Sequence, residues 1–392
     1  MEQLASGSRL FDETIELLQK KIFKNVRTEF HSLSLKPLQA LLLRGLIRRP
    51  YAGGLPARSN AGPLIKIRET PIPEPSDDQV IVKVVVSGTN PKDWKAVDIF
   101  NVVDVNQGDD IAGVVHAVGA NVTEFKPRDR VCAFHEMLAP GGSYGEYAVA
   151  WAYSMFHLPS NTSFEEAATI PLAALTAVAG PYRNDRLGLP QPWTPAEKSI
   201  PLVIYGGGTA VGSFAIQLAT RSNIHPLICV AGKSQEHVES LIERSKGDTI
   251  VDYRGDNDAV VEGIKAALGS STLLHAFDAV AEAPSYVNLA RVLATGDGRI
   301  TLVQDIEDLG DLVDRFKTSQ TKVASVHQDA KDMALVYTRY FSRGLQEGWF
   351  RSHPHQVVPG GLGGLQKALE NLKAGRASAT KFVVRIAETQ GI

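Results

Sequence analysis

Residues 202–221 decide the fold and read LVIYGGGTAVGSFAIQLATR. The letters LVIY predict a short buried strand, and the residues after the glycines predict a helix. Glycines permit a tight turn, while the first turn of a helix offers free N–H groups and a positive dipole to a pyrophosphate. A glycine-rich turn alone can be nothing more than a turn. Its place between a strand and a helix predicts a dinucleotide site at Gly206, Gly207, Gly208, Thr209, Ala210 and Val211.

The alternation of strand and helix extends over residues 171–303. Further strands are predicted at 226–230, 249–253, 275–280 and 299–303, with a helix from about Gln235. Such alternation implies parallel strands joined by right-handed helical crossovers. The predicted fold class is therefore α/β, with a doubly wound sheet of the Rossmann type.

The residues after the second of these strands indicate which dinucleotide binds. An NAD site expects Asp or Glu about 20 residues after the glycine turn, on the ribose 2′-OH. Residues 228–234 read ICVAGKS and hold no acid. Lys233 is instead placed to meet a 2′-phosphate, so we predict NADP(H); the alternative is an ordinary exposed lysine that starts a helix. Tyr253 ends the third strand and is placed to flank the same phosphate or ribose, or else is a half-buried strand tyrosine.

The chain before and after residues 171–303 has a different pattern of predicted secondary structure. Residues 38–150 are β-rich, with strands predicted at 79–87 and 111–118 between clusters of Pro, Gly and Asp. A helix over 364–374 and a last strand over 381–386 are predicted near the C-terminus. Because 392 residues are too many for one ordinary hydrophobic core, we expect two domains.

Composition excludes several classes of protein. The chain is 44% hydrophobic and 21% charged with a net charge of −2, which disfavours disorder and nucleic-acid binding. No run approaches the ~20 apolar residues of a membrane span. The cysteines, Cys132 and Cys229, number only two and form no disulfide framework, so a reducing, cytoplasmic location is expected.

Residues 1–37 lie outside this pattern. Apolar residues recur there at steps of three or four, as on one face of an amphipathic helix: Phe11, Ile15, Leu18, Ile22 and Val26. Acidic residues among the lysines argue against a transit peptide, and a secretory apolar core is missing. The extension is expected to pack on the domain body or to be loosely attached; the alternative is a targeting or docking element.

Several short motifs resemble those of the medium-chain dehydrogenase/reductases. The matching runs are NPKDWK at 90–95, GDDIAG at 108–113, VGANV at 118–122, KPRDRV at 126–131, GSYGEY at 142–147 and FEEAA at 164–168. The resemblance covers about Leu38 to Ile386 and implies a GroES-like catalytic domain beside the nucleotide domain. The implied organisation is an N-terminal helical extension at 1–37, a GroES-like domain at 38–170, an NADP-binding Rossmann domain at 171–341 and a C-terminal return to the catalytic domain at 342–392.

Within that superfamily the chain is most similar to the fungal trans-acting enoyl reductases that serve polyketide synthases. The resemblance rests on Lys95 shortly after Asn-Pro-x-Asp, on the insertion LGLPQP at 187–192, and on YGGGTA at 205–210. It implies NADPH-dependent hydride transfer to an activated C=C bond in secondary metabolism. The implied partners are a small or carrier-bound acyl substrate and a polyketide synthase.

The zinc ligands of this superfamily's alcohol dehydrogenases are replaced. Those enzymes place Cys near position 90 and Gly-His-Glu near position 108, where this chain has Asn90 and Gly108-Asp109-Asp110. The thiolate and the imidazole that a catalytic zinc requires are therefore missing. Cys132 and His135 form a tempting pair, but no second pair lies at metal spacing, so we expect no metal.

Without a metal, side chains must stabilise the charge that grows on the conjugated carbonyl oxygen. The resemblance points to Lys95, as a cation beside an enolate or a donor through water, and to Thr176, as a hydroxyl on the thioester carbonyl. The alternatives are a surface lysine and a buried threonine that bonds its own helix. Tyr144 is expected to line the cleft without a chemical role. We further assign Asn90, Lys92, Asp93 and Lys381 to cofactor binding.

Two other functions stay open at this point. One is a general NADPH-dependent quinone or enone oxidoreductase, and the other is a cofactor-binding protein without reductase activity. The dinucleotide turn is common to all three, whereas Lys95 and the insertion at 187–192 favour the enoyl reductase. We expect a monomer or homodimer with no nucleic-acid or membrane partner. The sequence does not indicate the acyl chain, the partner synthase or the proton donor.

Overall fold

Strand β1 (Gln79–Gly88) organises the first of two sheets in this computed structural model. Its run of valine and isoleucine is buried at most positions, as expected of a strand inside a sheet. One side of β1 pairs antiparallel with β2 (Asp110–Val118) along its whole length. Its other side pairs with β4 (Tyr147–Trp151) over the first half and with β13 (Lys381–Arg385) over the second.

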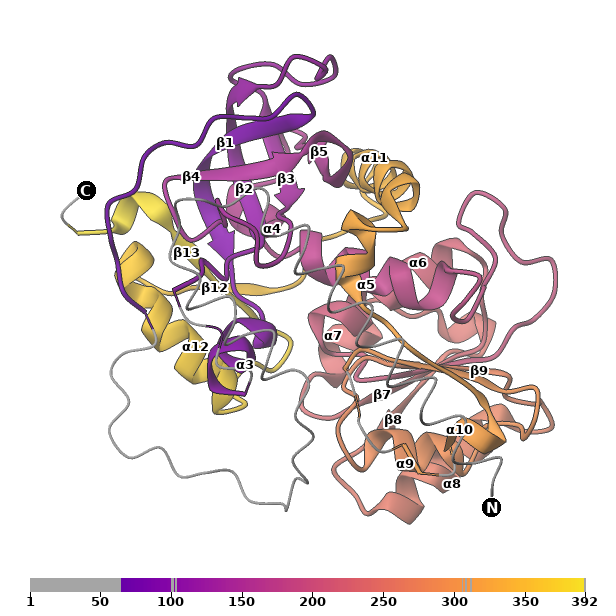
Figure 1. Cartoon of the computed structure of the whole chain (residues 1–392). Coiled ribbons are helices and arrows are strands. Elements are labelled where there is room, and N and C mark those ends of the chain that lie inside the picture. Colours follow the sequence, from indigo (N-terminus) through magenta and orange to yellow (C-terminus); the bar gives the residue numbers. More distant parts are fainter. Residues whose placement is uncertain are drawn as a thin grey trace, which may run out of the picture. The chain divides into compact units, whose positions relative to one another are not determined.

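The complete sheet has seven strands in the order β12-β13-β1-β2-β3-β5, with β4 on β1. Its other members are β3 (Arg130–Phe134), β5 (Met155–His157) and β12 (His355–Val357). In Figure 1 the yellow β12 and β13 lie beside the indigo β1, so the C-terminal segment returns to the sheet that the first strands build. The strand predicted at 381–386 is observed as β13.

The structure describes residues 65–390, apart from positions 100, 101, 103, 305, 307, 308 and 311. The helix predicted within residues 1–37 lies outside the described residues, as do residues 38–64 of the predicted catalytic domain.

The second sheet has six parallel strands in the order β11-β10-β9-β6-β7-β8. Its strands are β6 (Leu202–Tyr205), β7 (Leu227–Ala231), β8 (Thr249–Asp252), β9 (His275–Asp278), β10 (Arg299–Leu302) and β11 (Lys317–Gln320). The order reverses between β6 and β9, which is the switch point of a doubly wound sheet. The predicted Rossmann fold is confirmed, with strands at the five predicted positions and a sixth, β11, that the sequence analysis did not predict.

Helices connect and cover these strands (Figure 1). The α-helices are α3 (Pro91–Asp98), α4 (Phe164–Ala167), α5 (Pro171–Tyr182), α6 (Ala210–Arg221), α7 (Gln235–Glu239), α8 (Asn257–Leu268), α9 (Ser285–Ala290), α10 (Leu312–Arg315), α11 (Lys331–Glu347) and α12 (Leu365–Lys373). The 3₁₀ turns are η1 (Ala152–Ser154), η2 (Arg244–Lys246), η3 (Val323–His327), η4 (Gly361–Gly364) and η5 (Ile386–Glu388). Within the described part of the chain, no helix has the length and apolar character needed to cross a membrane.

One apolar cluster joins the two sheets. It contains Phe134 of β3 and Phe277 of β9, together with most of helix α5. Every residue of α5 is buried, because the helix packs on α6 of the nucleotide-binding part and also touches β2 and β3. The continuous core fixes the relative position of the glycine turn and the GroES-like strands.

Candidate functional site

The glycine turn between β6 and α6 has the geometry of a pyrophosphate cradle. Gly206 has a φ of +84°, which favours glycine. Thr209 caps α6, since its hydroxyl accepts a hydrogen bond from the N–H of Gly212 at 3.0 Å. A Cβ added at Gly212 would lie 2.2 Å from the carbonyl oxygen of Gly206, so only glycine allows the helix to approach the strand this closely.

This cradle fits a dinucleotide. The N–H groups of Ala210 and Val211 belong to the first turn of α6 and have no partner within the helix. Free N–H groups and the positive end of the helix dipole suit a pyrophosphate. Of the predicted cofactor residues, Gly206 to Val211 are therefore brought together as expected.

The end of β7 brings together the two residues predicted for the 2′-phosphate. Gly232 follows the strand, and a Cβ there would lie 2.9 Å from the hydroxyl oxygen of Tyr253. The Tyr253 ring, 49% exposed, thus lies against the backbone that carries the exposed Lys233. Lys233 and Tyr253 are both exposed and follow the carboxyl ends of β7 and β8; their contact with a 2′-phosphate stays a prediction.

Lys95 lies on α3 and reaches the nucleotide-binding part. Its ammonium donates a hydrogen bond to Oε1 of Gln304 at 2.6 Å and lies 3.2 Å from Oε1 of Glu282. These residues follow the carboxyl ends of β10 and β9. In a doubly wound sheet, dinucleotides bind across the crevice at the carboxyl ends of the strands, beside the switch point. Lys95 is therefore not an isolated surface lysine, since its side chain is only 19% exposed.

The turn after β9 is built on a buried carboxylate. Asp278 accepts hydrogen bonds from the N–H groups of Val280 at 3.0 Å and Ala281 at 2.8 Å, and from the hydroxyl of Ser285 at 2.5 Å. Burial raises the pKa of Asp278 to about 6. Ala281 has a φ of +54°, a rare conformation for a residue with a Cβ. The turn that presents Glu282 is thus held in a defined and strained shape.

Asn90 and Lys381 meet at a second buried carboxylate, Asp110. The Asn90 amide donates to Oδ2 of Asp110 at 2.6 Å, and the Lys381 ammonium lies 2.6 Å from the same oxygen. The other oxygen accepts the N–H of Leu172 at 2.8 Å, in the first turn of α5. All three side chains, those of Asn90, Lys381 and Asp110, are buried. The predicted cofactor residues Asn90 and Lys381 therefore tie β13, α3 and α5 together, and their contact with the cofactor stays a prediction.

Lys92 and Asp93 belong to a neighbouring polar cluster. The Lys92 ammonium lies 2.5 Å from Asp109 and 2.8 Å from Asp93, and the Tyr144 hydroxyl donates to Asp93 at 2.6 Å. Burial lowers the pKa of Lys92, but the charges of Asp93 and Asp109 outweigh it and raise that pKa above its ordinary value. Burial raises the pKa of Asp93, against the opposing charge of Lys92. The cofactor role of both residues stays a prediction.

The position of the missing zinc ligand is part of this cluster. Asp109 also lies 3.2 Å from Nδ1 of His135. A lysine cation thus contacts the carboxylate where the zinc enzymes have an imidazole. In the described residues, no group of three or more His, Cys, Asp or Glu side chains is placed to hold a metal ion.

Thr176 is buried in α5. Its hydroxyl donates to the carbonyl oxygen of Leu172, one turn earlier, at 2.7 Å. This is the local bond that the alternative interpretation expected, and it leaves the lone pairs of the oxygen available to a donor. A direct contribution of Thr176 to chemistry stays a prediction.

Sequence reasoning missed the partners of Lys95. Glu282 and Gln304 both follow strands whose positions were predicted. The rule that ligands bind beyond the carboxyl ends of parallel strands could have indicated them. Asp110 lies within the GDDIAG run at 108–113, but its buried partners Asn90 and Lys381 are 20 and 271 residues away in the sequence, so the spacing of residues does not indicate them.

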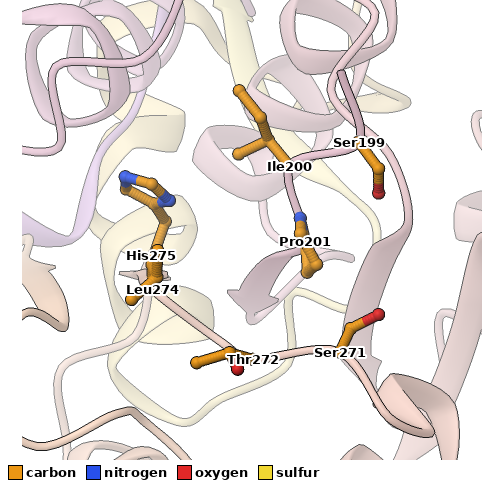
Figure 2. A pocket seen from close by; sticks show the side chains of 7 residues that line it. All are labelled: Ser199, Ile200, Pro201, Ser271, Thr272, Leu274 and His275. Carbon is orange, nitrogen blue, oxygen red and sulfur yellow. The ribbon is translucent and has the colours of Figure 1, made fainter.

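A separate surface hollow lies away from this site (Figure 2). It has a volume of about 340 Å³ and is lined by Ser199, Ile200, Pro201, Ser271, Thr272, Leu274 and His275. Pro201 and Leu274 directly precede β6 and β9. The hollow is therefore at the amino ends of the strands, whereas the glycine turn is at their carboxyl ends.

Known proteins resemble both parts of the chain. The alcohol dehydrogenase GroES-like domain matches residues 76–160. Trans-enoyl reductase fsr4 of Gibberella fujikuroi is 49% identical over 302 residues, covering 76% of this chain and 89% of that protein. Dehydrogenase pigH of Monascus ruber is 29% identical over 361 residues, covering 83% of this chain and 96% of that protein. The structure of CurK enoyl reductase shares the fold, with a TM-score of 0.65 and 18% identity over 81% of this chain and 94% of that one.

The GroES-like strands, the doubly wound sheet and the glycine turn define an oxidoreductase of the medium-chain dehydrogenase/reductase class. Within this class, the chain belongs to the family of fungal trans-enoyl reductases.

Proposed function

We propose that the protein reduces the C=C bond of an enoyl thioester presented by a polyketide synthase, with NADPH as its cofactor. The observation that carries this proposal is the position of Lys95, whose ammonium meets the loops after β9 and β10 at the nicotinamide end of the sheet. When bound, NADPH supplies the hydride that is added to the β-carbon of the substrate.

Lys95 stabilises the negative charge that the addition places on the thioester oxygen. A preorganised cation is most effective where charge develops and where water is scarce. The Lys95 side chain is four-fifths shielded from solvent, and its partners limit the number of conformations that it samples. Thr176, on the buried helix α5, is proposed to turn its hydroxyl from the carbonyl oxygen of Leu172 to the substrate and to donate to the thioester carbonyl.

NADPH is proposed over NADH because of the side chains at the end of β7. Lys233 stands where an NAD site would carry an acid, and no acid occurs within residues 228–234. The half-exposed ring of Tyr253 lies against Gly232, the residue before Lys233. A lysine cation suits a 2′-phosphate, whereas a carboxylate would repel it.

The domain bounds follow the same assignment. The strands of the first sheet lie within 79–157 and 355–385, and those of the second lie within 202–320. We propose a catalytic domain at 38–170, a nucleotide-binding domain at 171–341 and a return to the catalytic domain at 342–392.

A paired substrate assay tests the proposal. NADPH consumption is measured with an enoyl-pantetheine thioester and, separately, with a small quinone. We expect turnover of the thioester at a much higher kcat/KM than that of the quinone. Preference for the quinone would make the protein a general enone or quinone reductase, and turnover of neither would indicate a cofactor-binding protein.

A further inference from the structure

The loops that follow β9 and β10 share one hydrogen-bonded arrangement. The amide nitrogen of Gln304 donates to the carbonyl oxygen of Val280 at 2.7 Å. Because a carbonyl can only accept, this bond fixes the orientation of the amide and turns its oxygen to the other side. That oxygen is the atom that accepts the Lys95 ammonium, at 2.6 Å.

Glu282 contacts the same ammonium from the neighbouring loop. The distance from its Oε1 to Nζ of Lys95 is 3.2 Å, and the Glu282 side chain is 64% exposed. An ion pair this exposed is weakened by solvent, so Glu282 contributes less than the shorter bond from Gln304. Three hydrogen bonds to Asp278 hold the turn that carries Glu282. The backbone at Glu282 therefore has a defined position, which limits where the Glu282 carboxylate can lie.

Lys95 needs such partners for a physical reason. Its four-carbon side chain has many rotamers, and confining it costs conformational entropy. A cation acts best on a developing charge when it is oriented before the reaction. Gln304 and Glu282 supply this orientation from two loops at the nicotinamide end of the sheet.

We propose that Gln304 and Glu282 are positioning residues that hold the Lys95 ammonium for the reduction step, Gln304 with the larger effect. This inference rests on the proposed function, since it assigns partners to the cation that the proposed chemistry uses. Neither residue is placed on the substrate itself.

The test is a set of double-mutant cycles. Gln304→Ala should lower kcat for an enoyl-pantetheine thioester by roughly tenfold or more, as expected for a lost hydrogen bond to a charged group. Glu282→Gln should lower it by less than about fivefold. The Kd for NADPH should not change. In a Lys95→Ala background, neither substitution should lower kcat further, because both act through the same ammonium.

Two control substitutions of the same residue types, neither of them at a partner of Lys95, test whether the effect depends on the contact with Lys95. Gln356→Ala removes an exposed glutamine on β12, and Glu262→Gln removes an exposed glutamate that is paired with Lys265 on α8. Both should leave kcat unchanged. If Gln304→Ala instead raises the Kd for NADPH at constant kcat, Gln304 is a cofactor ligand and the proposal is wrong. Additive losses of kcat in the Lys95→Ala background would also overturn it.

Thermal unfolding of the same proteins gives a readout that needs no turnover. If Lys95 and Gln304 are hydrogen-bonded in solution, the changes in Tm for Lys95→Ala and Gln304→Ala should be non-additive. Additive changes would contradict this hydrogen bond whatever the activity. Non-additive changes together with no wild-type turnover of the thioester would support the hydrogen bond and overturn the proposed function instead.

Discussion

Lys233 is the residue on which the proposed preference for NADPH depends. Lys233 is exposed and follows Gly232, where a Cβ would meet the ring of Tyr253. In the proposed function, this exposed cation pairs with the 2′-phosphate of NADPH. Affinity for NADPH should therefore depend on this charge far more than affinity for NADH does.

Lys233→Ala should weaken NADPH binding by about 1.5–3 kcal/mol, the contribution of one charge-assisted hydrogen bond. NADH affinity should change little, because NADH has no 2′-phosphate. Fluorescence titration of both cofactors measures the effect, and Lys265→Ala, an exposed lysine on α8, is the control. Equal affinities of the wild type for the two cofactors would contradict the assignment.

At the scale of elements, the junction of β6 and α6 depends on close backbone contact. The space between Gly212 and the carbonyl of Gly206 is too small for a side chain. The helix can hold its N–H groups over the pyrophosphate only while it stays this near to the strand.

Gly212→Ala should push α6 away from β6. We expect a loss of about 1–3 kcal/mol of stability, as for other overpacked sites, together with a large loss of dinucleotide affinity. Gly363→Ala is the matched control, because no atom lies within 4 Å of a Cβ at that position. Chemical denaturation and NADPH titration report the two effects. Unchanged binding by the Gly212 variant would show that the turn is not the cofactor cradle.

The turn after β9 should make stability depend on pH. Burial raises the pKa of Asp278 from 3.8 to about 6, so the folded state holds this proton more tightly than the unfolded state between those values. The contribution of Asp278 to the free energy of unfolding therefore falls as the pH rises from about 4 to 6, by about 3 kcal/mol.

Asp278→Asn cannot ionise and keeps an oxygen for the N–H donors of Val280 and Ala281. The variant should lose less stability than the wild type between pH 4 and pH 7. Urea denaturation at both pH values measures the difference, in which the contributions of all other groups cancel. Parallel pH profiles of the two proteins would show that Asp278 does not titrate in this window.

At the scale of the whole molecule, the Lys381–Asp110 pair joins segments far apart in the sequence. Lys381 begins β13, Asp110 begins β2, and the same carboxylate receives the first turn of α5. Lys381 and Asp110 are both buried, so neither charge can be left alone without a large cost.

Lys381→Met should lower the free energy of unfolding by about 3–5 kcal/mol, because it leaves the Asp110 carboxylate buried without its cation. Lys317→Met is the control: that lysine is 57% exposed, its partner Asp297 is 86% exposed, and its loss should cost no more than about 1 kcal/mol. The free energies of unfolding are measured by denaturant unfolding. Equal losses for the two substitutions would show that the buried Lys381–Asp110 pair contributes no more to stability than an exposed ion pair.

The sequence allowed the local features to be predicted and left the distant contacts open. The glycine turn, strands β1, β2 and β13, and the strands of the second sheet from β6 to β10 follow from periodicity and turn chemistry, which act over a few residues. Lys95 was predicted only by resemblance, and its partners stand 187 and 209 residues away. Asn90 and Lys381 are likewise far apart in the sequence, so their shared contact with Asp110 could not be predicted from it. For Thr176 the local alternative describes the observed bond, since a hydroxyl inside a helix readily bonds its own backbone.

Single-turnover reduction of an enoyl-pantetheine thioester by wild type and Lys95→Ala, each saturated with NADPH, tests the account most directly. The Lys95 ammonium donates hydrogen bonds to Glu282 and Gln304, which follow the carboxyl ends of β9 and β10. Removing one preorganised electrostatic contact commonly costs ~10²–10³ in rate, and we predict a loss of this size with NADPH affinity nearly unchanged. A near-normal rate in Lys95→Ala would contradict the account and move the charge-stabilising role to another group.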